Sequence, residues 1–285
     1  MIKVWYTDFW GGWDPYNNCF SDIFLKGIDY VIDPDPDILV YSCFGNKHER
    51  YSCKKIYWTG ENTRPDLKAD LALGFDYLEE DNYIRVPLYA ISYWTALNEM
   101  KLGEKLETFL LRKKEPPKHS KFCAFVYANA HLGTNAWGNY QDGVEKRVRM
   151  FHKISEKKKV DSIGTALNNT GITVSGISKL NAIKDYKFTF AIENSSYPGY
   201  VTEKIIEPMM MHSVPIYWGS REIKKDFQGG YLNLHEMDED DAIEYMLELD
   251  AKPQLYEELY YQNFLDRMSK YFDYSIIENR INSLF

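Results

Sequence analysis

The 285-residue sequence lacks both the long apolar segments and the paired cysteines that mark several large classes of protein. No apolar run approaches the ~20 residues of a membrane-spanning helix, and the first residues do not have the basic and apolar regions of a signal peptide. The four cysteines form no C-x-x-C pair and have no spacing to histidine that suggests zinc. We therefore expect a cytoplasmic chain without a transmembrane segment, with reduced thiols, for which a peripheral membrane contact stays open.

Positive charges are outnumbered by negative ones. The net charge is -8 and the isoelectric point is about 5.4, so we expect no broad basic surface for nucleic acid, although a local cationic pocket is not excluded. Two acidic runs could suggest metal sites. Asp33–Asp37 contains two prolines and reads as a solvated loop, and Asp238–Asp241 reads as the acidic first turn of a helix. Neither run predicts a metal site.

The sequence does contain a regular alternation of short β-prone runs and helical segments, which predicts an α/β fold with parallel sheets. The predicted strands are 2–6, 29–32, 37–41, 55–58, 71–75, 83–87, 121–127, 160–163, 188–192, 214–218 and 231–234. The predicted helices are 17–26, 92–111, 142–158, 202–211, 242–249 and 255–272.

The polar segment 112–120, which carries a proline pair, reads as a linker between two domains. This predicts an N-terminal domain over 1–115 and a C-terminal domain over 116–285. A C-terminal helix at about 268–285 can pack back on the first domain.

The run from Phe188 to Ser220 carries the clearest local signal for a ligand site. It reads as a strand, a loop with Pro and Gly, a helix with Thr202 as its N-cap, and a second strand. In such units, ligands bind beyond the carboxyl ends of the strands and near helix N-termini. The polar residues of the run fall there: Glu193, Asn194, Tyr200, Glu203 and Lys204. They suit a phosphate, although Glu203 and Lys204 could equally be ordinary charges of a first helical turn.

Two further residues are candidates on their position alone. Glu61 follows a predicted strand beside Gly60, where catalytic groups of α/β folds often lie, although many such residues only cap a turn. Arg147 falls in the early turns of the helix predicted to begin at Asp142, where it could contact a phosphate or simply be solvated. The Trp10–Trp13 segment could shape an acceptor pocket or be a packed turn.

Four blocks of the sequence resemble the α-1,3-fucosyltransferases of glycosyltransferase family 10. The first is F-x-x-E-N, a short loop, Y-V-T-E-K and P-I-Y-W-G within Phe188–Ser220. The second is Tyr57–Asn62 followed by Ala72–Asp76, and the third is Arg85–Tyr89. The fourth is Phe125–Asn129 with the downstream Arg147. These blocks cover most of the span from Lys55 to Ser220, and the resemblance is weak outside it.

The resemblance implies a GT-B fold, in which two Rossmann-like domains face each other across a cleft. It implies inverting transfer of L-fucose from GDP-fucose to the N-acetylglucosamine of an N-acetyllactosamine-type glycan. Glu61 would be the general base, and Glu203 would contact the fucose. Lys204 and Arg147 would hold the pyrophosphate. Asn129, Asn194 and Tyr200 would complete the donor site.

The chemistry of inverting transfer needs these residue types. A carboxylate must remove the acceptor proton, which is worth ~10²–10⁴-fold in rate, and cations must neutralise the departing GDP. The resemblance thus implies no required cofactor, with Mn²⁺ or Mg²⁺ at most stimulating transfer.

The chain departs from the family at Pro198 in the donor loop, and it shows neither the membrane anchor of animal members nor the heptad repeats of some bacterial ones. Two alternatives remain open: a GT-B transferase that uses another nucleotide sugar, and a non-catalytic glycan-binding protein.

Overall fold

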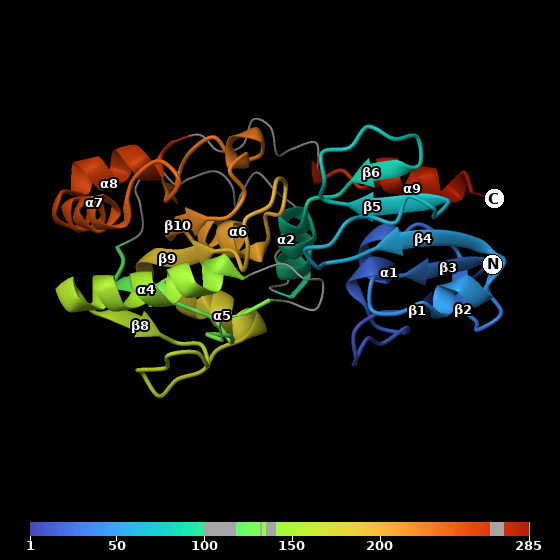
Figure 1. The fold of residues 1–285 in the computed structure, drawn as a ribbon, viewed down its shortest axis with the longest axis horizontal. Coiled ribbons are helices and arrows are strands. Elements are labelled where there is room, and N and C mark those ends of the chain that lie inside the picture. The colour runs from blue at the N-terminus through green and yellow to red at the C-terminus, as the bar shows by residue number, and fades with distance from the viewer. Residues whose placement is uncertain (100–117, 132, 135–140, 263–270, 285) are drawn as a thin grey trace. The chain divides into compact units, whose positions relative to one another are not determined.

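The structure, a computed structural model, describes all residues except 100–117, 132, 135–140, 263–270 and 285. The chain divides into two compact units, Met1–Ile91 with Ser269–Phe285 and Ser92–Met268. The domain boundary predicted at 115/116 lies within 100–117, outside the described residues. Each unit is an α/β structure built on a parallel sheet (Figure 1), as the sequence predicts.

The first unit contains a six-stranded parallel sheet with the order β2-β1-β3-β4-β5-β6. Its strands are β1 Ile2–Thr7, β2 Tyr30–Ile32, β3 Ile38–Tyr41, β4 Lys54–Trp58, β5 Leu71–Gly74 and β6 Tyr83–Arg85. All residues of β3 and β5 are buried, which explains why they are continuous apolar runs and not alternating ones. The unit also contains α1 Cys19–Phe24, the 3₁₀ helix η1 Lys47–Arg50 and α9 Ser275–Asn282, while α2 Leu88–Glu99 crosses the division between the units.

The second unit contains a five-stranded parallel sheet with the order β11-β10-β9-β7-β8. Its strands are β7 Lys121–Phe125, β8 Val160–Ser162, β9 Tyr186–Ile192, β10 Val214–Trp218 and β11 Leu232–Asn233. Its helices are α4 Asp142–Lys157, α5 Gly176–Ile183, α6 Glu203–Met210, α7 Glu239–Ala251 and α8 Pro253–Tyr260, with the 3₁₀ helix η2 Ile223–Lys225. Residues of α4, α7 and α8 share one core cluster with the strands, whereas α5 packs against a separate cluster around Ala124, Ile163 and Tyr186.

Both sheets have the same topology, and this determines where a ligand is expected. In each, the second strand lies on one side of the first and the later strands continue on the other side. The strand order therefore reverses between β1 and β3 in the first unit and between β7 and β9 in the second. Ligands of open parallel sheets bind at the carboxyl ends of the strands at such a switch point.

The sequence-based assignment missed three short helices and placed the start of α2 too late. None of η1, α5 and η2 was predicted, because each is short and α5 begins with a glycine. Helix α2 begins at Leu88 and not at Ser92, directly after Pro87. The acidic run Asp238–Asp241 lies at the start of α7, as predicted, and the structure shows that Asp238 is the N-cap. Within the described residues no helix has the length and apolar content to cross a membrane.

Candidate active site

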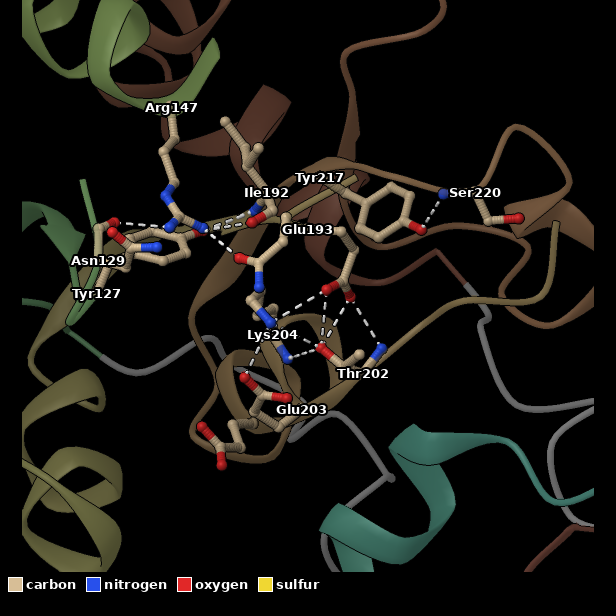
Figure 2. Close-up of polar contacts among 12 residues, drawn as sticks. Tyr127, Asn129, Arg147, Ile192, Glu193, Thr202, Glu203, Lys204, Tyr217 and Ser220 are labelled. Atoms are coloured by element: carbon tan, nitrogen blue, oxygen red, sulfur yellow. Dashed lines mark hydrogen bonds and ion pairs between the residues drawn. The ribbon is translucent and has the colours of Figure 1, made fainter. Parts of the chain in front are cut away.

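A buried arginine lies at the switch point of the second unit. Arg147, in the second turn of α4, is 1% exposed. Its guanidinium donates to Asn194 Oδ1 at 2.8 Å and to the carbonyl of Asn129 at 2.6 Å, and lies 4.1 Å from the centre of the Tyr127 ring (Figure 2). Among the described residues, no carboxylate forms an ion pair with it and its Nε has no hydrogen-bond partner. Burial lowers the pKa of Arg147.

A cation held only by neutral groups in a buried site is costly, since its desolvation is not offset by an opposite charge. Arg147 is therefore suited to an anionic ligand. The position of α4, which carries Arg147, depends on Gly143. A Cβ on Gly143 would lie 1.8 Å from the carbonyl oxygen of Glu193, so only glycine lets the helix pack this closely against the end of β9.

A second cation lies at the N-terminus of α6. The ammonium of Lys204 is 3.1 Å from each of three acceptors: Thr202 Oγ1, Glu193 Oε2 and Glu203 Oε1 (Figure 2). Glu193, directly after β9, is fully buried and accepts from the Thr202 backbone N–H at 2.8 Å and from Thr202 Oγ1 at 2.9 Å. Thr202 caps the helix, as the sequence predicts. One buried carboxylate therefore ties the strand end to the helix start.

Burial and neighbouring charges shift the pKa values of Glu193, Glu203 and Lys204 in opposite directions. Burial alone would raise the pKa of Glu203, but Lys204 and then Lys179 outweigh it and lower the pKa to about 2. Burial would lower the pKa of Lys204, but Glu193 and Glu203 raise it well above its usual value. Burial raises the pKa of Glu193, and Lys204 opposes this. Lys204 and Glu203 are thus both ionised near neutral pH.

These side chains surround a pocket of about 600 Å³ beyond the carboxyl ends of β7 and β9. Five of the six donor-site residues predicted from the sequence line it: Asn129, Arg147, Asn194, Glu203 and Lys204. Tyr200, the sixth, is 5% exposed and is not among the lining residues. Lys179 also lines the pocket and pairs with Glu207 at 2.5 Å. It was missed because α5, which carries it, was not predicted.

Glu61 lies in the first unit, in the turn that follows β4. Its backbone N–H donates to Thr59 Oγ1 at 3.1 Å, and its carbonyl accepts from Thr63 N at 2.7 Å. The next residues hold the turn in place. Arg64 donates to Asn62 Oδ1 at 2.7 Å and forms an ion pair with Asp76. The sequence block that contains Glu61 is thus a fixed turn at the carboxyl edge of the sheet.

Comparison with known proteins places the chain in a family. Residues 129–272 match the model of the glycosyltransferase family 10 (fucosyltransferase) C-terminal region, and residues 4–93 match that of the α-(1,3)-fucosyltransferase FucT N-terminal domain. The chain belongs to glycosyltransferase family 10. The resemblance seen in the sequence is confirmed, and the matched regions of this family 10 chain contain Glu61 and the residues predicted for a donor site.

The family 10 chain is 30% identical over 233 residues to the α-(1,3)-fucosyltransferase FucT of Helicobacter pylori. This alignment covers 76% of the chain and 48% of the H. pylori protein. It is 30% identical over 130 residues to human α-(1,3)-fucosyltransferase 4, covering 44% of this chain and 24% of the human protein. The chain therefore spans about half the length, or less, of these curated relatives.

Solved structures of α1,3-fucosyltransferases have the same fold as this chain. A crystal structure of an α1,3-fucosyltransferase superposes with a TM-score of 0.76 at 25% identity, covering 99% of this chain and 89% of that one. Another, with GDP-fucose, shares the fold with a TM-score of 0.75 at 24% identity, covering 99% of this chain and 90% of that one. The GT-B class predicted from the sequence is confirmed for this chain.

Proposed function

We propose that this family 10 chain is a GDP-fucose-dependent α-1,3-fucosyltransferase. It moves L-fucose, with inversion, to the N-acetylglucosamine of an N-acetyllactosamine-type glycan. The names of its relatives support the donor and the linkage. The observation that carries the proposal is Arg147, a buried cation bonded to neutral groups beside a pocket that also contains Lys204.

The pyrophosphate of the donor would supply the missing negative charge. The Lys204 ammonium contacts three acceptors, which belong to Thr202, Glu193 and Glu203. Glu203 is the most exposed of these three partners, so we expect it to release Lys204 to the phosphate and turn to the fucose. Asn129 and Asn194 hold Arg147, and Tyr200 lies in the loop that leads into α6.

The reaction is a single displacement. The acceptor hydroxyl oxygen forms a bond to the anomeric carbon as the bond from that carbon to the phosphate oxygen breaks, and GDP leaves with the bonding pair. Glu61 accepts the hydroxyl proton. Glu203, ionised because its pKa is lowered to about 2, stabilises positive charge that develops on the sugar. Arg147 and Lys204 stabilise the negative charge on GDP.

We also expect transfer without a required metal, because two protein cations are available for the leaving group. Addition of Mn²⁺ or Mg²⁺ should stimulate at most by binding product GDP. Chelation with EDTA should then leave a substantial rate, and a complete loss of transfer that Mn²⁺ restores would contradict this expectation.

Separate variants test the two halves of the proposal. Arg147→Gln should weaken GDP binding about ten- to a hundredfold, since a charged hydrogen-bonded contact is worth ~1.5–3 kcal/mol. Glu61→Gln should abolish fucose transfer and leave GDP-fucose binding, measured by calorimetry, intact. Arg149→Gln is the matched control, because Arg149 lies on the same helix but pairs with Glu239 on α7.

Three results would overturn the proposal. Lost donor binding in Glu61→Gln would remove the assigned base role. Tighter binding of a UDP-sugar than of GDP-fucose would indicate another transferase of the same fold. Glycan binding without any nucleotide binding would indicate a non-catalytic glycan-binding protein.

A further inference from the structure

The pocket of the second unit contains a third cation, on a helix that the proposed mechanism does not use. Lys179, in α5, lines the pocket together with Glu203 and Lys204 of α6. Its ammonium forms an ion pair with Glu207 Oε2 at 2.5 Å, and the side chains of Lys179 and Glu207 are 21% and 15% exposed. This pair joins α5 to α6 beside the pocket.

The partner of Lys179 lies on the same face of α6 as Glu203. Glu203 is the first residue of the helix, and Glu207 follows four residues later. Residues at this spacing are neighbours on the helix surface, one turn apart. Glu207 therefore holds the Lys179 ammonium against the side of α6 that carries Glu203.

The charge of Lys179 acts on both acids. Burial would raise the pKa of Glu203, but Lys204 and then Lys179 lower it. Burial raises the pKa of Glu207, and Lys179 opposes this effect. Lys179 is thus a second cation for Glu203, in addition to the Lys204 ammonium at 3.1 Å.

The charges around Glu203 come from four elements of the second unit, and they balance. Three cations and three carboxylates of the described residues act on one another here. They are Arg147 of α4, Lys179 of α5, Lys204, Glu203 and Glu207 of α6, and Glu193 directly after β9. A sugar nucleotide would add the negative charges of its pyrophosphate, so the site would then carry an excess of negative charge.

Donor binding would also remove the nearest cation from Glu203. In the proposed mechanism Lys204 and Arg147 bind the pyrophosphate, which leaves Glu203 beside an anion. Loss of a cation and approach of an anion both favour the protonated form of a carboxyl group. A protonated Glu203 would not stabilise positive charge on the sugar. The mechanism therefore needs a cation that stays beside Glu203, and Lys179 is held in that position by Glu207.

We propose that Lys179 is a positioning residue for fucose transfer. Paired with Glu207, it holds the Glu203 carboxylate beside the fucose after Lys204 has turned to the pyrophosphate. Glu203 then remains ionised throughout the displacement, and Lys179 does not bind the phosphates. The inference rests on the proposed function, because it assigns a further residue to the same reaction.

The pH dependence of kcat tests the proposal. Lys179→Met should move the acidic limb of the kcat profile upwards by about one pH unit, since a nearby opposite charge lowers the pKa of a carboxyl group by ~1–3 units. On that limb kcat should fall about tenfold, while kcat at pH 8 and KM for GDP-fucose change little. Lys179→Arg should restore the profile, because it keeps the charge. Lys184→Met is the matched control, since Lys184 caps the same helix, is exposed and does not line the pocket.

A second pair of variants assigns the shift to Glu203. The acidic limb also contains the ionisation of the proposed base, Glu61, which is the same in both proteins. In the residual activity of Glu203→Gln, Lys179→Met should leave the profile unchanged, because the carboxyl group on which Lys179 acts is absent. Lys179→Met with Glu207→Gln removes the acid that the single variant leaves unpaired. It should show the same shift as Lys179→Met, which separates the effect from a loss of stability.

A titration without transfer separates this inference from the proposed function. The full chain is labelled with ¹³C-glutamate and saturated with GDP, and the Glu203 carboxyl signal is identified by its absence in Glu203→Gln. The pKa of this signal should rise by about one unit in Lys179→Met. If it does so in a protein that transfers fucose to no acceptor, the coupling of Lys179 to Glu203 stands and the proposed function fails.

Two results would overturn the inference while fucose transfer stands. The first is a Lys179→Met protein in which both the acidic limb of kcat and the Glu203 titration are unchanged. The second is a Lys179→Met protein that keeps the pH profile but binds GDP at least tenfold more weakly by calorimetry. Lys179 would then bind the phosphates directly and would not position Glu203.

Discussion

At the scale of single residues, Lys204 shows how a buried positive charge is stabilised in the pocket of the second unit. The lysine is surrounded by Thr202, Glu193 and Glu203, and its positive charge is compensated by two carboxylates. Glu193 is fully buried, whereas the side chain of Glu203 is 35% exposed. The two acids therefore differ in their surroundings: Glu193 contacts Lys204 from a fully buried position, and Glu203 contacts it from a partly exposed one.

We predict that Glu193→Gln destabilises the second unit by about 3 kcal/mol, because it leaves a buried lysine with half of its charge compensation. Urea unfolding at pH 7 measures the change. Glu222→Gln is the control, since Glu222 pairs with Lys225 at the surface and should cost no more than ~1 kcal/mol. Equal midpoints for the two variants would show that Glu193 does not stabilise the site.

Most residues of the proposed donor site that line the pocket of the second unit could be named from the sequence, but for two different reasons. Glu193, Asn194, Thr202, Glu203 and Lys204 lie in one continuous run, where strand, cap and helix signals place them together. Asn129 and Arg147 lie far from that run, and only the family resemblance joined them to it. The stacking of Arg147 on Tyr127 has no periodic signal, since it depends on how α4 crosses the sheet.

At the scale of elements, buried strands were the most predictable part of the chain. Strand β10 has the predicted bounds, and most other strands differ only at their ends. Their apolar content is set by burial on both faces, which a sequence shows directly. Helix η1 was also missed because tertiary contacts, such as the Asp8 bonds to its start, stabilise it.

Charges also connect elements, and the link between α4 and α7 predicts a pH dependence. Hydrogen bonds from Arg149, then Lys146, lower the pKa of Glu239 to about 2 although burial opposes this. A carboxylate with a lowered pKa stabilises the fold above its unfolded pKa of about 4.3, and this contribution is lost as the pH falls towards 2. Glu239→Gln should therefore cost about 1–2 kcal/mol at pH 6, and the difference should shrink by pH 3.

Urea unfolding of both proteins at pH 6 and pH 3 measures this difference. Glu145→Gln is a suitable control, because Glu145 contacts Arg149 within α4 and does not connect the two helices. A deficit in Glu239→Gln that is the same at both pH values would show that the ion pairs do not supply the pH-dependent stability.

At the scale of the whole molecule, the chain forms two units from three segments, because residues after Met268 belong to the first unit. The connection is made by side chains: Arg280 donates to the carbonyl of Asp81 at 2.7 Å, and the Arg85 guanidinium lies 4.9 Å from the centre of the Tyr271 ring. Ile281 of α9 is fully buried. That a C-terminal helix at about 268–285 packs back on a first domain of residues 1–115 stays a prediction.

We predict that Ile281→Ala destabilises the first unit by about 2–5 kcal/mol, the usual cost of truncating a buried isoleucine. Hydrogen exchange should show lost amide protection in β1, β3 and β4, although these strands lie at the opposite end of the sequence. Amides of β7, β9 and β10, which have their own core, should keep their protection. Ile276→Ala is the matched control, since Ile276 lies on the same helix but is 60% exposed. Loss of protection confined to the second unit, or equal effects of the two variants, would contradict the assignment of α9 to the first unit.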